Sequence, residues 1–407
     1  MKWAASILIF SVAVLIGLGM VMLYSSSMNM DLELRRPKLA GGPAALAGSA
    51  GLKVEADKPS VGTHYLMSQF KLFLAALACA IVAACVDYRR LKKLSPWLLG
   101  LSVVLLILVF APVVGHAAKG AHRWIGRPGG QTYFQPSELA KLALILFLAA
   151  YADRYQRQMA GFKKGLAIPG AVMAVVLALI FIEPDRGCTI LLAAVCGVML
   201  IVAGARLSFL FLSAPILAGA LAFSFLHDRM RMGRIMAWLH PEENKDGAGY
   251  QVREAMIALG SGGPFGLGLG NGRQKLGFVP EHHTDFIFSI IGEELGLVAT
   301  MLVVLLFIVL IICGVLIARR ASDTFGLLLA AGLTFMIGFQ AFINLGVVTG
   351  MLPNKGMPLP FISYGGSNLV LMLVSVGLLI SISRFAKEAV PQKSSNPFDV
   401  ALDTAHA

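Results

Sequence analysis

Runs of about 20 predominantly apolar residues recur along almost the whole chain, and each is long enough to cross a hydrocarbon core of roughly 30 Å as an α-helix. Of the 407 residues, 57% are hydrophobic and only 14% are charged, which is too apolar for a soluble protein of ordinary charge content. The sequence therefore predicts an all-α polytopic membrane protein. It leaves no room for a separate soluble catalytic domain.

We expect about ten transmembrane helices in a single domain over residues 1–384. The first run follows Lys2 without a small-residue cleavage pattern and a soluble sequel, so we expect a span there rather than a signal peptide. The expected spans are 3–23, 66–86, 96–115, 137–153, 166–183, 188–204, 207–226, 285–317, 324–351 and 366–383.

Short basic connections set the expected orientation. DYRRLKK, RYQRQMAGFKKG, GARL and ARRAS fall on one side together with both termini, and the positive-inside rule makes that side cytoplasmic. Residues 385–407 then form a polar cytoplasmic tail. On the opposite side we expect a flexible Ala/Gly/Ser-rich loop at 25–65 and a large extracytoplasmic loop at 227–284, between spans 7 and 8.

Many lysines and arginines also lie in the expected outer loops, and the formal net charge is +12. Long loops have little influence on topology, so this outer basic excess does not reverse the orientation. It requires another explanation, for which an anionic ligand or anionic lipid headgroups are the candidates.

The loop 227–284 is expected to contain two short amphipathic helices. In DRMRMGRIMAWLH, one helical face holds Met232, Ile235, Met236 and Leu239, and Arg229, Arg231 and Arg234 lie off it. This pattern suits either a helix in the membrane interface or a buried amphipathic helix. GYQVREAMIALG predicts the second helix. No strand precedes the following GLGLGNG, so its glycines indicate tight turns or close approach to a ligand rather than a nucleotide site.

The stretch FQPSELAKL carries charges into an apolar run. Pro136 and Ser137 have the features of a helix start, and Glu138 and Lys141 lie one turn apart on one face. An ionisable group inside a span costs about 2.5–3.5 kcal/mol on insertion scales, so Lys141 should pair or face a polar cavity. The structural alternative is that Lys141 snorkels to the interface or simply pairs with Glu138.

Acids also stand where spans begin or end. In FIEPDRG, Glu183 and Asp185 flank a proline that ends a span, and a tight turn alone would explain the proline and glycine. In PEHHTDFIFSIIGEELG, Asp285 precedes the next apolar run, either as a charge at the positive end of a helix or as a chemical group.

Glu293 and Glu294 interrupt the run 285–317, which is too long for one straight crossing. For these two acids a structural pairing role and a catalytic role remain open.

The last outer connection, NLGVVTGMLPNKGMPLPFISYGGSNLV, is rich in proline and glycine and carries Lys355, Ser363, Tyr364 and Asn368. Irregular backbone at membrane depth is tolerated only where it is buried in protein or lines a cavity. We therefore expect the outer polar segments to converge on one cavity.

Taken together, these segments resemble the SEDS family (shape, elongation, division and sporulation) of bacterial peptidoglycan polymerases. HRWI, FQPSELAKL, EPDRG, GLGLGNG, PEHHTDFIFSIIGEELG and PLPFISYGGSN occur in the family's order, and the resemblance covers the chain from the first span to Arg384. IIGEELG and LPNKGMPLPFISYGGSN are more similar to the FtsW division branch than to the RodA elongation branch. Arg186 and Cys188 depart from the family's commoner apolar and threonine residues after EPD.

The resemblance implies a glycosyltransferase of the bacterial cytoplasmic (inner) membrane that polymerises lipid II into glycan strands at the outer face, during septal cell-wall synthesis. The family's proposed catalytic aspartate falls on Asp285, which we expect to be the general base, because a sugar hydroxyl is a poor nucleophile. The polyprenyl pyrophosphate leaving group needs cations, for which Arg123, Lys141 and Lys275 are candidates. The full set of candidate substrate-binding residues is Arg123, Gln135, Ser137, Glu138, Lys141, Asn271, Lys275, His283, Lys355, Ser363 and Tyr364.

The expected partners are lipid II, membrane lipid, other cell-division proteins and a class B penicillin-binding protein, because the chain has no domain that could crosslink peptides. Nucleic acid is not expected. No cofactor is demanded, the metal ligands are unknown, and Mg²⁺ or Mn²⁺ would be one way to meet the pyrophosphate charge. The alternatives are a lipid II flippase, with Glu138, Lys141, Glu293 and Glu294 along its path, and a catalytically silent scaffold.

Overall fold

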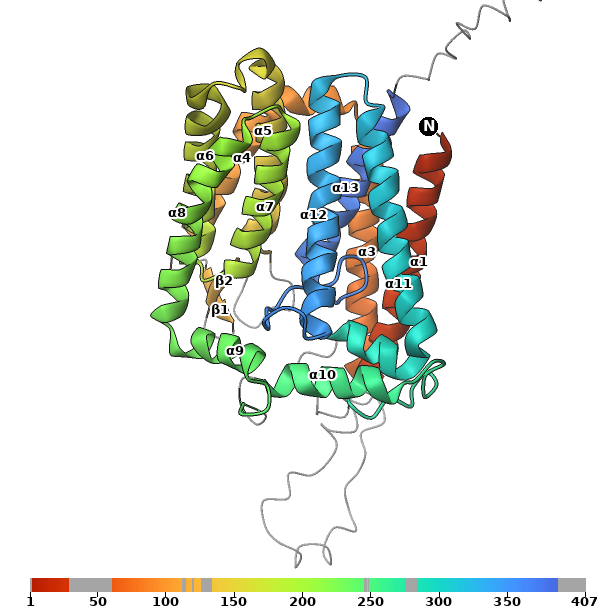
Figure 1. The fold of residues 1–407 in the computed structure, drawn as a ribbon. Helices are drawn as coiled ribbons and strands as arrows, with labels where there is room; N and C mark the ends of the chain where they lie inside the picture. Colours follow the sequence, from red (N-terminus) through yellow and green to blue (C-terminus); the bar gives the residue numbers. More distant parts are fainter. Residues whose placement is uncertain are drawn as a thin grey trace, which may run out of the picture.

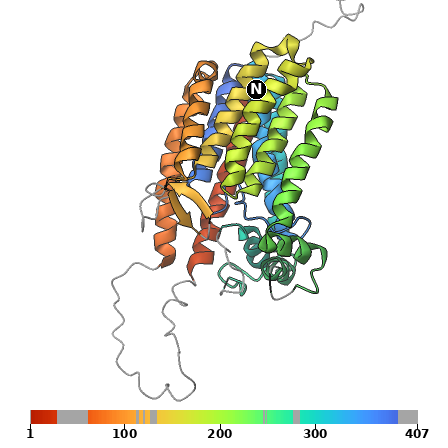
Figure 2. The same ribbon diagram turned by 90° about the vertical axis from the view of Figure 1, so that its left-hand side faces the viewer.

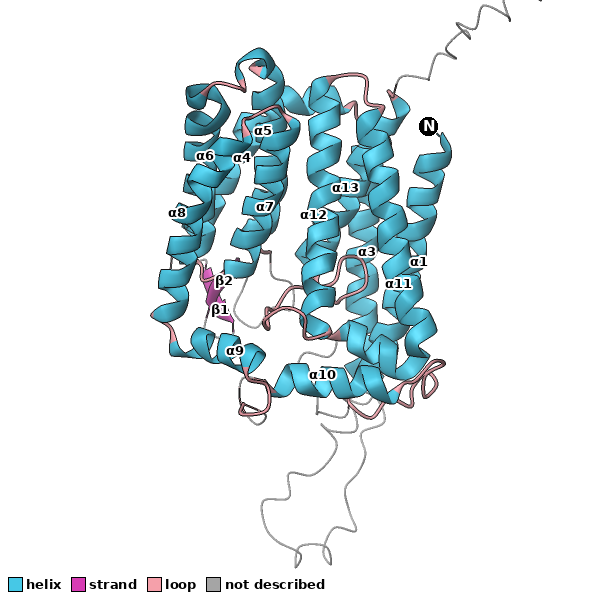
Figure 3. Ribbon diagram, viewed as in Figure 1, coloured by secondary structure: helices cyan, strands magenta, loops and turns pink. Residues whose placement is uncertain are grey.

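The structure is a computed structural model that describes residues 2–28, 61–111, 115–118, 121–125, 134–244, 247, 249–275 and 284–386. The described chain forms a bundle of long helices that lie side by side (Figure 1, Figure 3). The long helices are α1 (Lys2–Met28), α3 (Val61–Cys85), α4 (Tyr88–Leu108), α5 (Pro136–Arg154), α6 (Ile168–Ile182), α7 (Arg186–Val202), α8 (Leu207–Leu226), α11 (Ile287–Arg319), α12 (Thr324–Val348) and α13 (Gly366–Arg384).

The two ends of the bundle differ. The amphipathic helices α9 (Arg229–Leu239) and α10 (Tyr250–Ser261) lie across one end, which also holds the α12–α13 loop, residues 349–365 (Figure 1). The antiparallel strands β1 (Gly115–Ala118) and β2 (Ala121–Ile125) lie toward this same end (Figure 2). We call it the loop end. The opposite end holds the start of α1, the end of α13, the 3₁₀ turn η2 (Gln156–Gln158) and the π-helical turn η3 (Lys163–Ala167).

Seven helices of the described chain are long and apolar enough to cross a membrane, by length and composition. They are α1, α3, α4, α11, α12, α13 and the η3–α6 segment Lys163–Ile182. The other three expected spans coincide with α5, α7 and α8. A mostly helical polytopic membrane protein is thus confirmed, although the β1–β2 hairpin departs from an all-α fold, and ten crossings stays a prediction.

Several expected boundaries were wrong by a few residues. α4 begins at Tyr88, so the basic connection DYRRLKK lies largely inside a helix. The side chain of Asp87 accepts a hydrogen bond from Arg89 N at 3.0 Å and caps α4, which starts the helix early through residues that favour helix. α1 runs to Met28 and α3 starts at Val61, so helices occupy both ends of the expected loop 25–65.

The centre of that loop, residues 29–60, and residues 387–407 of the expected tail lie outside the described residues.

Close backbone approach holds the helices together. A Cβ on Gly377 of α13 would lie 2.3 Å from the carbonyl oxygen of Ala80 in α3, so only glycine permits this contact. Small residues at such contacts are typical of helix packing in membranes, where tight van der Waals contact replaces the hydrophobic effect. Of the seven candidate spans, α12 and α13 are the most deeply buried.

α11 bends at Gly296, whose φ of 77° is a left-handed conformation that favours glycine. The bend divides the 33-residue helix into a short piece at the loop end and a long piece through the bundle. This agrees with the expectation that the run is too long for one straight crossing.

Candidate active site at the loop end

Asp285 lies just before α11, and its backbone is held from two directions. Nδ2 of Asn344, a buried residue of α12, donates hydrogen bonds to the backbone oxygens of Asp285 at 2.7 Å and of Met357 at 2.6 Å. The hydroxyl of Ser363 donates to Thr284 O at 2.6 Å. These contacts fix the Asp285 backbone against α12 and the α12–α13 loop.

The carboxylate of Asp285 rests on that loop. A Cβ on Gly356 would lie only 2.7 Å from Asp285 Oδ2, so a larger residue would displace the carboxylate. The N-cap residue of α11 is Phe286, whose own side chain makes no capping hydrogen bond. Asp285 is partly buried one residue earlier, and its two interpretations, as a charge at the positive end of the helix and as a chemical group, both stay open.

Lys355, next to Gly356, extends the site toward α7. A Cβ on Gly187 would lie 3.4 Å from Lys355 Cε, so the lysine packs against the first turn of α7. Burial, followed by repulsion from Arg186, Arg231 and Arg234, lowers the pKa of Lys355 to about 8, against the attraction of Asp185. Lys355 and Gly356, which the Asp285 carboxylate contacts, are thus consecutive residues of the α12–α13 loop.

Arg123, Gln135 and Ser137 gather around Asp185, the N-cap of α7. The guanidinium of Arg123 donates to Glu183 O at 3.1 Å and Pro184 O at 2.6 Å, and its Nη1 lies 3.9 Å from Asp185 Oδ2. Gln135 Nε2 donates to Asp185 Oδ2 at 3.3 Å and to Ser137 Oγ at 3.0 Å. Arg123 and Gln135 are thus joined to the start of α7, and Ser137 in the first turn of α5 is joined to it through Gln135.

Glu138 and Lys141 form a buried ion pair inside the bundle, 2.9 Å between Oε2 and Nζ. Lys141 Nζ also donates to Gln340 Oε1 at 3.1 Å. Nε2 of Gln340 donates in turn to Pro358 O at 3.0 Å and Asn368 Oδ1 at 2.9 Å. Lys141 therefore does not snorkel, and the pair is connected to the α12–α13 loop through Gln340.

An apolar cavity of about 450 Å³ opens beside this pair, between α3, α5 and α13. Its lining is mostly aliphatic, and Glu138 and Ser367 contribute to its polar part. The lining residues are Leu72, Phe134, Glu138, Leu139, Leu142, Gly366, Ser367, Val370, Leu371 and Val374. Glu138 thus belongs both to the lining of this apolar cavity and to the buried ion pair.

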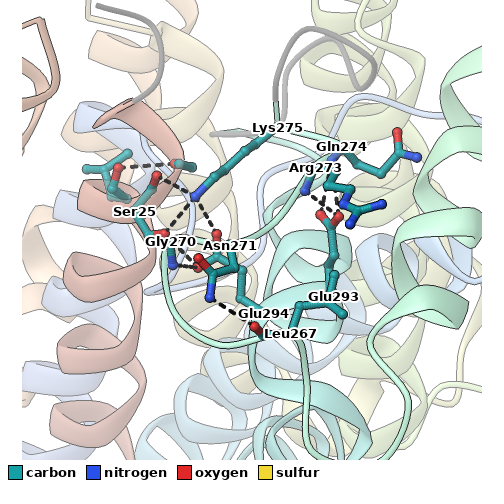
Figure 4. A network of polar contacts seen from close by, with 11 residues as sticks. Ser25, Leu267, Gly270, Asn271, Arg273, Gln274, Lys275, Glu293 and Glu294 are labelled. Carbon is teal, nitrogen blue, oxygen red and sulfur yellow. Dashed lines mark hydrogen bonds and ion pairs between the residues drawn. The ribbon is translucent and has the colours of Figure 1, made fainter. Parts of the chain in front are cut away.

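Glu293 and Glu294 take part in a separate network of polar contacts, shown in Figure 4. Oε1 of Glu293 accepts hydrogen bonds from Arg273 N at 2.6 Å and Gln274 N at 3.1 Å. Glu294 accepts from Gly270 N at 3.1 Å and from the hydroxyl of Ser25 at 2.6 Å. Both carboxylates are buried, and they bind the glycine-rich segment 262–275 to the bend of α11.

Lys275 completes this network. Its ammonium lies 2.6 Å from Glu294 Oε1 and donates to Ser25 O at 3.2 Å, with both charged side chains almost fully buried. Asn271 is exposed and donates to Leu267 O at 3.1 Å. Substrate binding by Lys275 and Asn271 stays a prediction, and the contacts of Lys275 favour a structural role.

The structure thus connects Asp285, Lys355 and Ser363 through the α12–α13 loop, and separates them from the Lys275 network. Tyr364 is partly buried next to Ser363, and His283 lies outside the described residues. Gln340 and Asn344 were missed. They are the two amide residues of an apolar span, one turn apart on one face, and that spacing is the signal that could have identified them.

Within the described residues, no group of three or more histidine, cysteine, aspartate or glutamate side chains could hold a metal ion. Residues 276–283, which contain Glu281, His282 and His283, are not among them. A divalent cation therefore stays a prediction.

Comparison with known proteins points to one family. Residues 48–388 match the sequence profile of the FtsW/RodA/SpoVE family, described as a cell cycle protein. A probable peptidoglycan glycosyltransferase FtsW from Geobacter metallireducens is 42% identical over 323 residues, 79% of this chain and 85% of that protein. The stage V sporulation protein E of Bacillus subtilis is 41% identical over 303 residues, 74% of this chain and 82% of that protein.

Solved structures show the same fold. A chain from a study of the structural coordination of polymerization and crosslinking by a peptidoglycan synthase complex aligns with a TM-score of 0.67 and 26% identity, over 93% of this chain and 96% of that one. The rod shape determining protein RodA of Thermus thermophilus aligns with a TM-score of 0.63 and 26% identity, over 94% of this chain and 97% of that one.

Proposed function

The chain belongs to the FtsW/RodA/SpoVE family of cell cycle proteins, and we propose that it polymerises lipid II with Asp285 as the general base. Relatives named as peptidoglycan glycosyltransferases match about four fifths of the chain, which supports glycosyltransferase activity. The observation that carries the role of Asp285 is the way this segment is held, since Asn344 and Ser363 bind its backbone while the carboxylate contacts Gly356.

In the proposed reaction the carboxylate of Asp285 takes the proton of a sugar hydroxyl as its oxygen attacks the anomeric carbon of a second, lipid-linked sugar. The new glycosidic bond forms while the bond from the anomeric carbon to the pyrophosphate oxygen breaks, and the electron pair leaves with the pyrophosphate. This single displacement inverts the anomeric centre. The activated leaving group needs no protonating acid, so one carboxylate is sufficient.

The cations proposed for the leaving group differ in how they are held. Arg123 donates to two backbone oxygens, and Lys141 is paired with Glu138. We propose that both contribute mainly by fixing the walls of the site. Lys355 precedes Gly356, the residue that the Asp285 carboxylate contacts, and it is proposed to bind substrate directly together with Ser363 and Tyr364 of the same loop.

The apolar cavity beside Glu138 is proposed to hold part of the polyprenyl chain of lipid II. Its lining comes from three helices, and its polar residues lie where the chain would meet its sugar-bearing end. Apolar walls with a few polar groups are typical of ligand pockets.

We propose that the loop end faces the extracytoplasmic side. The start of α1 and the end of α13 lie at the opposite end, together with the basic connections around residues 154–164 and 319–321 (Figure 1). The positive-inside rule then places that end and both termini in the cytoplasm. Septal synthesis is proposed from the resemblance to the FtsW branch.

A class B penicillin-binding protein is proposed as partner, because new glycan strands must be crosslinked as well as polymerised to form a cell wall. The structural similarity to a chain of a peptidoglycan synthase complex supports this.

The flippase alternative is weakened by the contacts of the four residues proposed for its path. Glu293 and Glu294 are saturated by the segment 262–275 and Ser25, and Glu138 is paired with Lys141.

The direct test is purified protein with lipid II in liposomes, with and without its cognate transpeptidase. Glycan polymer on a gel supports the polymerase, and movement of labelled lipid II between leaflets without polymer would establish the flippase instead. If the protein makes no polymer and moves no lipid II, the catalytically silent scaffold is the remaining hypothesis.

A further inference from the structure

Two arginines from different helices converge on one hydroxyl group at the loop end. Arg186, the first residue of α7, donates from Nε to Ser224 Oγ at 2.8 Å, and Arg231 of α9 donates from Nη1 to the same atom at 2.9 Å. Ser224 is buried. A hydroxyl oxygen can accept two hydrogen bonds but carries no negative charge, so it holds both guanidinium groups without neutralising either.

The two arginines differ in their remaining contacts within the described chain. Nε of Arg231 pairs with Asp228 Oδ2 at 3.0 Å. Arg186 lies over the ring of Phe181 at 3.6 Å, and its Nη1 is buried without a hydrogen-bond partner among the described residues. Buried donors are nearly always paired in native proteins, so this one indicates an acceptor that the described chain does not supply.

The surrounding charge is mostly positive. Arg186 is repelled by Arg231 and Arg123, and Lys355 is repelled by Arg186, Arg231 and Arg234, whereas the acids that act on one or the other are Asp185 and Asp228. Asp185 is also engaged by Gln135 and caps α7, and Asp228 is engaged by Arg231. The start of α7 adds the positive end of a helix, which favours anions.

We propose that Arg186, Arg231 and Lys355 form a binding site for the pyrophosphate group of a lipid-linked sugar, which we call the arginine site. Guanidinium groups match phosphate oxygens with paired hydrogen bonds, and a nearby ammonium adds a third cation. The site adjoins Asp285 because Lys355 is followed directly by Gly356, against which the carboxylate rests. This inference rests on the proposed function and names the side chains that would receive its leaving group. It also accounts for part of the outer basic excess.

The test is direct binding of inorganic pyrophosphate to the full chain in detergent, by calorimetry, for the wild type, Arg186→Gln and Arg231→Gln. Each substitution removes one charge but keeps a polar side chain, and we expect about ten-fold weaker binding from the loss of a charge-assisted pair. Arg157→Gln is the matched control, since Arg157 is exposed on η2 at the other end of the bundle. Unchanged binding in Arg186→Gln and Arg231→Gln, or equal weakening in the control, would overturn the site.

Two further measurements keep the result unambiguous. Lys355→Met alters the loop side of the site and should also weaken binding, which covers the case in which an arginine variant fails to fold. Nanodiscs containing phosphatidylglycerol or only phosphatidylcholine test the other source of phosphate. If the substitutions weaken phosphatidylglycerol binding and leave pyrophosphate binding intact, the cluster is a lipid headgroup site and the proposal is wrong.

Failure of the proposed function would appear separately, as wild-type protein that binds pyrophosphate in an arginine-dependent way but makes no polymer.

Discussion

The stretch from Asp285 to Glu294 holds three acids that the structure treats in two ways. Glu293 and Glu294 are buried, and their oxygens accept hydrogen bonds from backbone amides, a serine and Lys275. Asp285 is partly buried, its backbone is held by Asn344, and its carboxylate rests on a glycine. In the first arrangement, the carboxylates of Glu293 and Glu294 are paired and hold the segment 262–275 in place. In the second, the backbone of Asp285 is held, and we propose that this positions its carboxylate for chemistry.

The comparison shows that an acid in a membrane protein must be judged by what its oxygens contact, because all three would cost free energy if left unpaired in an apolar phase. Saturated carboxylates should matter for stability. A carboxylate whose backbone is held in a fixed position, as in Asp285, should matter for turnover.

The largest effect on stability is expected for Glu294→Ala, which leaves Lys275 buried without its partner. Breaking a buried ion pair typically costs about 3–5 kcal/mol, and reversible unfolding in detergent should show a loss of that size. Glu243→Gln changes an exposed acid at the same end and should have almost no effect.

Adding Lys275→Met to Glu294→Ala should restore much of the stability, because replacing both partners of a buried pair removes the uncompensated charge. If Glu294→Ala lies within about 1 kcal/mol of wild type, the division into structural and chemical acids fails.

A smaller effect, on activity alone, is expected for Gly356→Ala. The added Cβ would lie 2.7 Å from Asp285 Oδ2 and must displace the carboxylate. Misplacement of a catalytic group by about 1 Å can cost up to about 10²-fold, so polymer formation should fall by about ten-fold or more while the protein stays folded. Gly260→Ala, where nothing lies within 4 Å of the new Cβ, is the control. Equal activities of the two variants would contradict the proposal that Gly356 positions the Asp285 carboxylate.

The smallest effect is a change in pH dependence. The pKa of Lys355 is lowered to about 8, so its protonated form is lost in the folded protein as the pH rises through that value. Burial is the largest cause of this low pKa; Asp185, the N-cap of α7, opposes it, and Arg186 and the α9 arginines Arg231 and Arg234 add to it. We expect kcat/KM to fall above pH 8 in the wild type and to stay level in Lys355→Arg, because arginine remains protonated. If kcat/KM falls equally above pH 8 in the wild type and in Lys355→Arg, deprotonation of Lys355 is not the cause of the fall.

The same shift has a stability consequence of defined sign. A lysine whose folded pKa lies below its unfolded value of 10.5 destabilises the fold at pH values below about 8. That penalty disappears between pH 8 and 10.5. The free energy of unfolding should therefore rise over this range in wild type and not in Lys355→Met.

The sequence predicted the helical fold well because about 20 apolar residues in a row have few other solutions in a bilayer. It predicted that Glu138 and Lys141 share a face, since spacing along a helix determines this. It left Glu293 and Glu294 undecided because their partners lie in a glycine-rich segment that folds back on α11, a contact without a local signal. Gln340 and Asn344 were overlooked although their spacing was visible.

The central claim is tested most directly by Asp285→Asn in a polymerisation assay with lipid II. Asparagine keeps the shape of the side chain but cannot take the proton of the attacking hydroxyl, so polymer formation should fall by about 10²-fold or more. Lipid II binding and the unfolding midpoint should match wild type, because the contacts that hold the segment come from the Asp285 backbone and from Ser363. A folded Asp285→Asn protein that makes polymer within a few-fold of wild type would contradict the account.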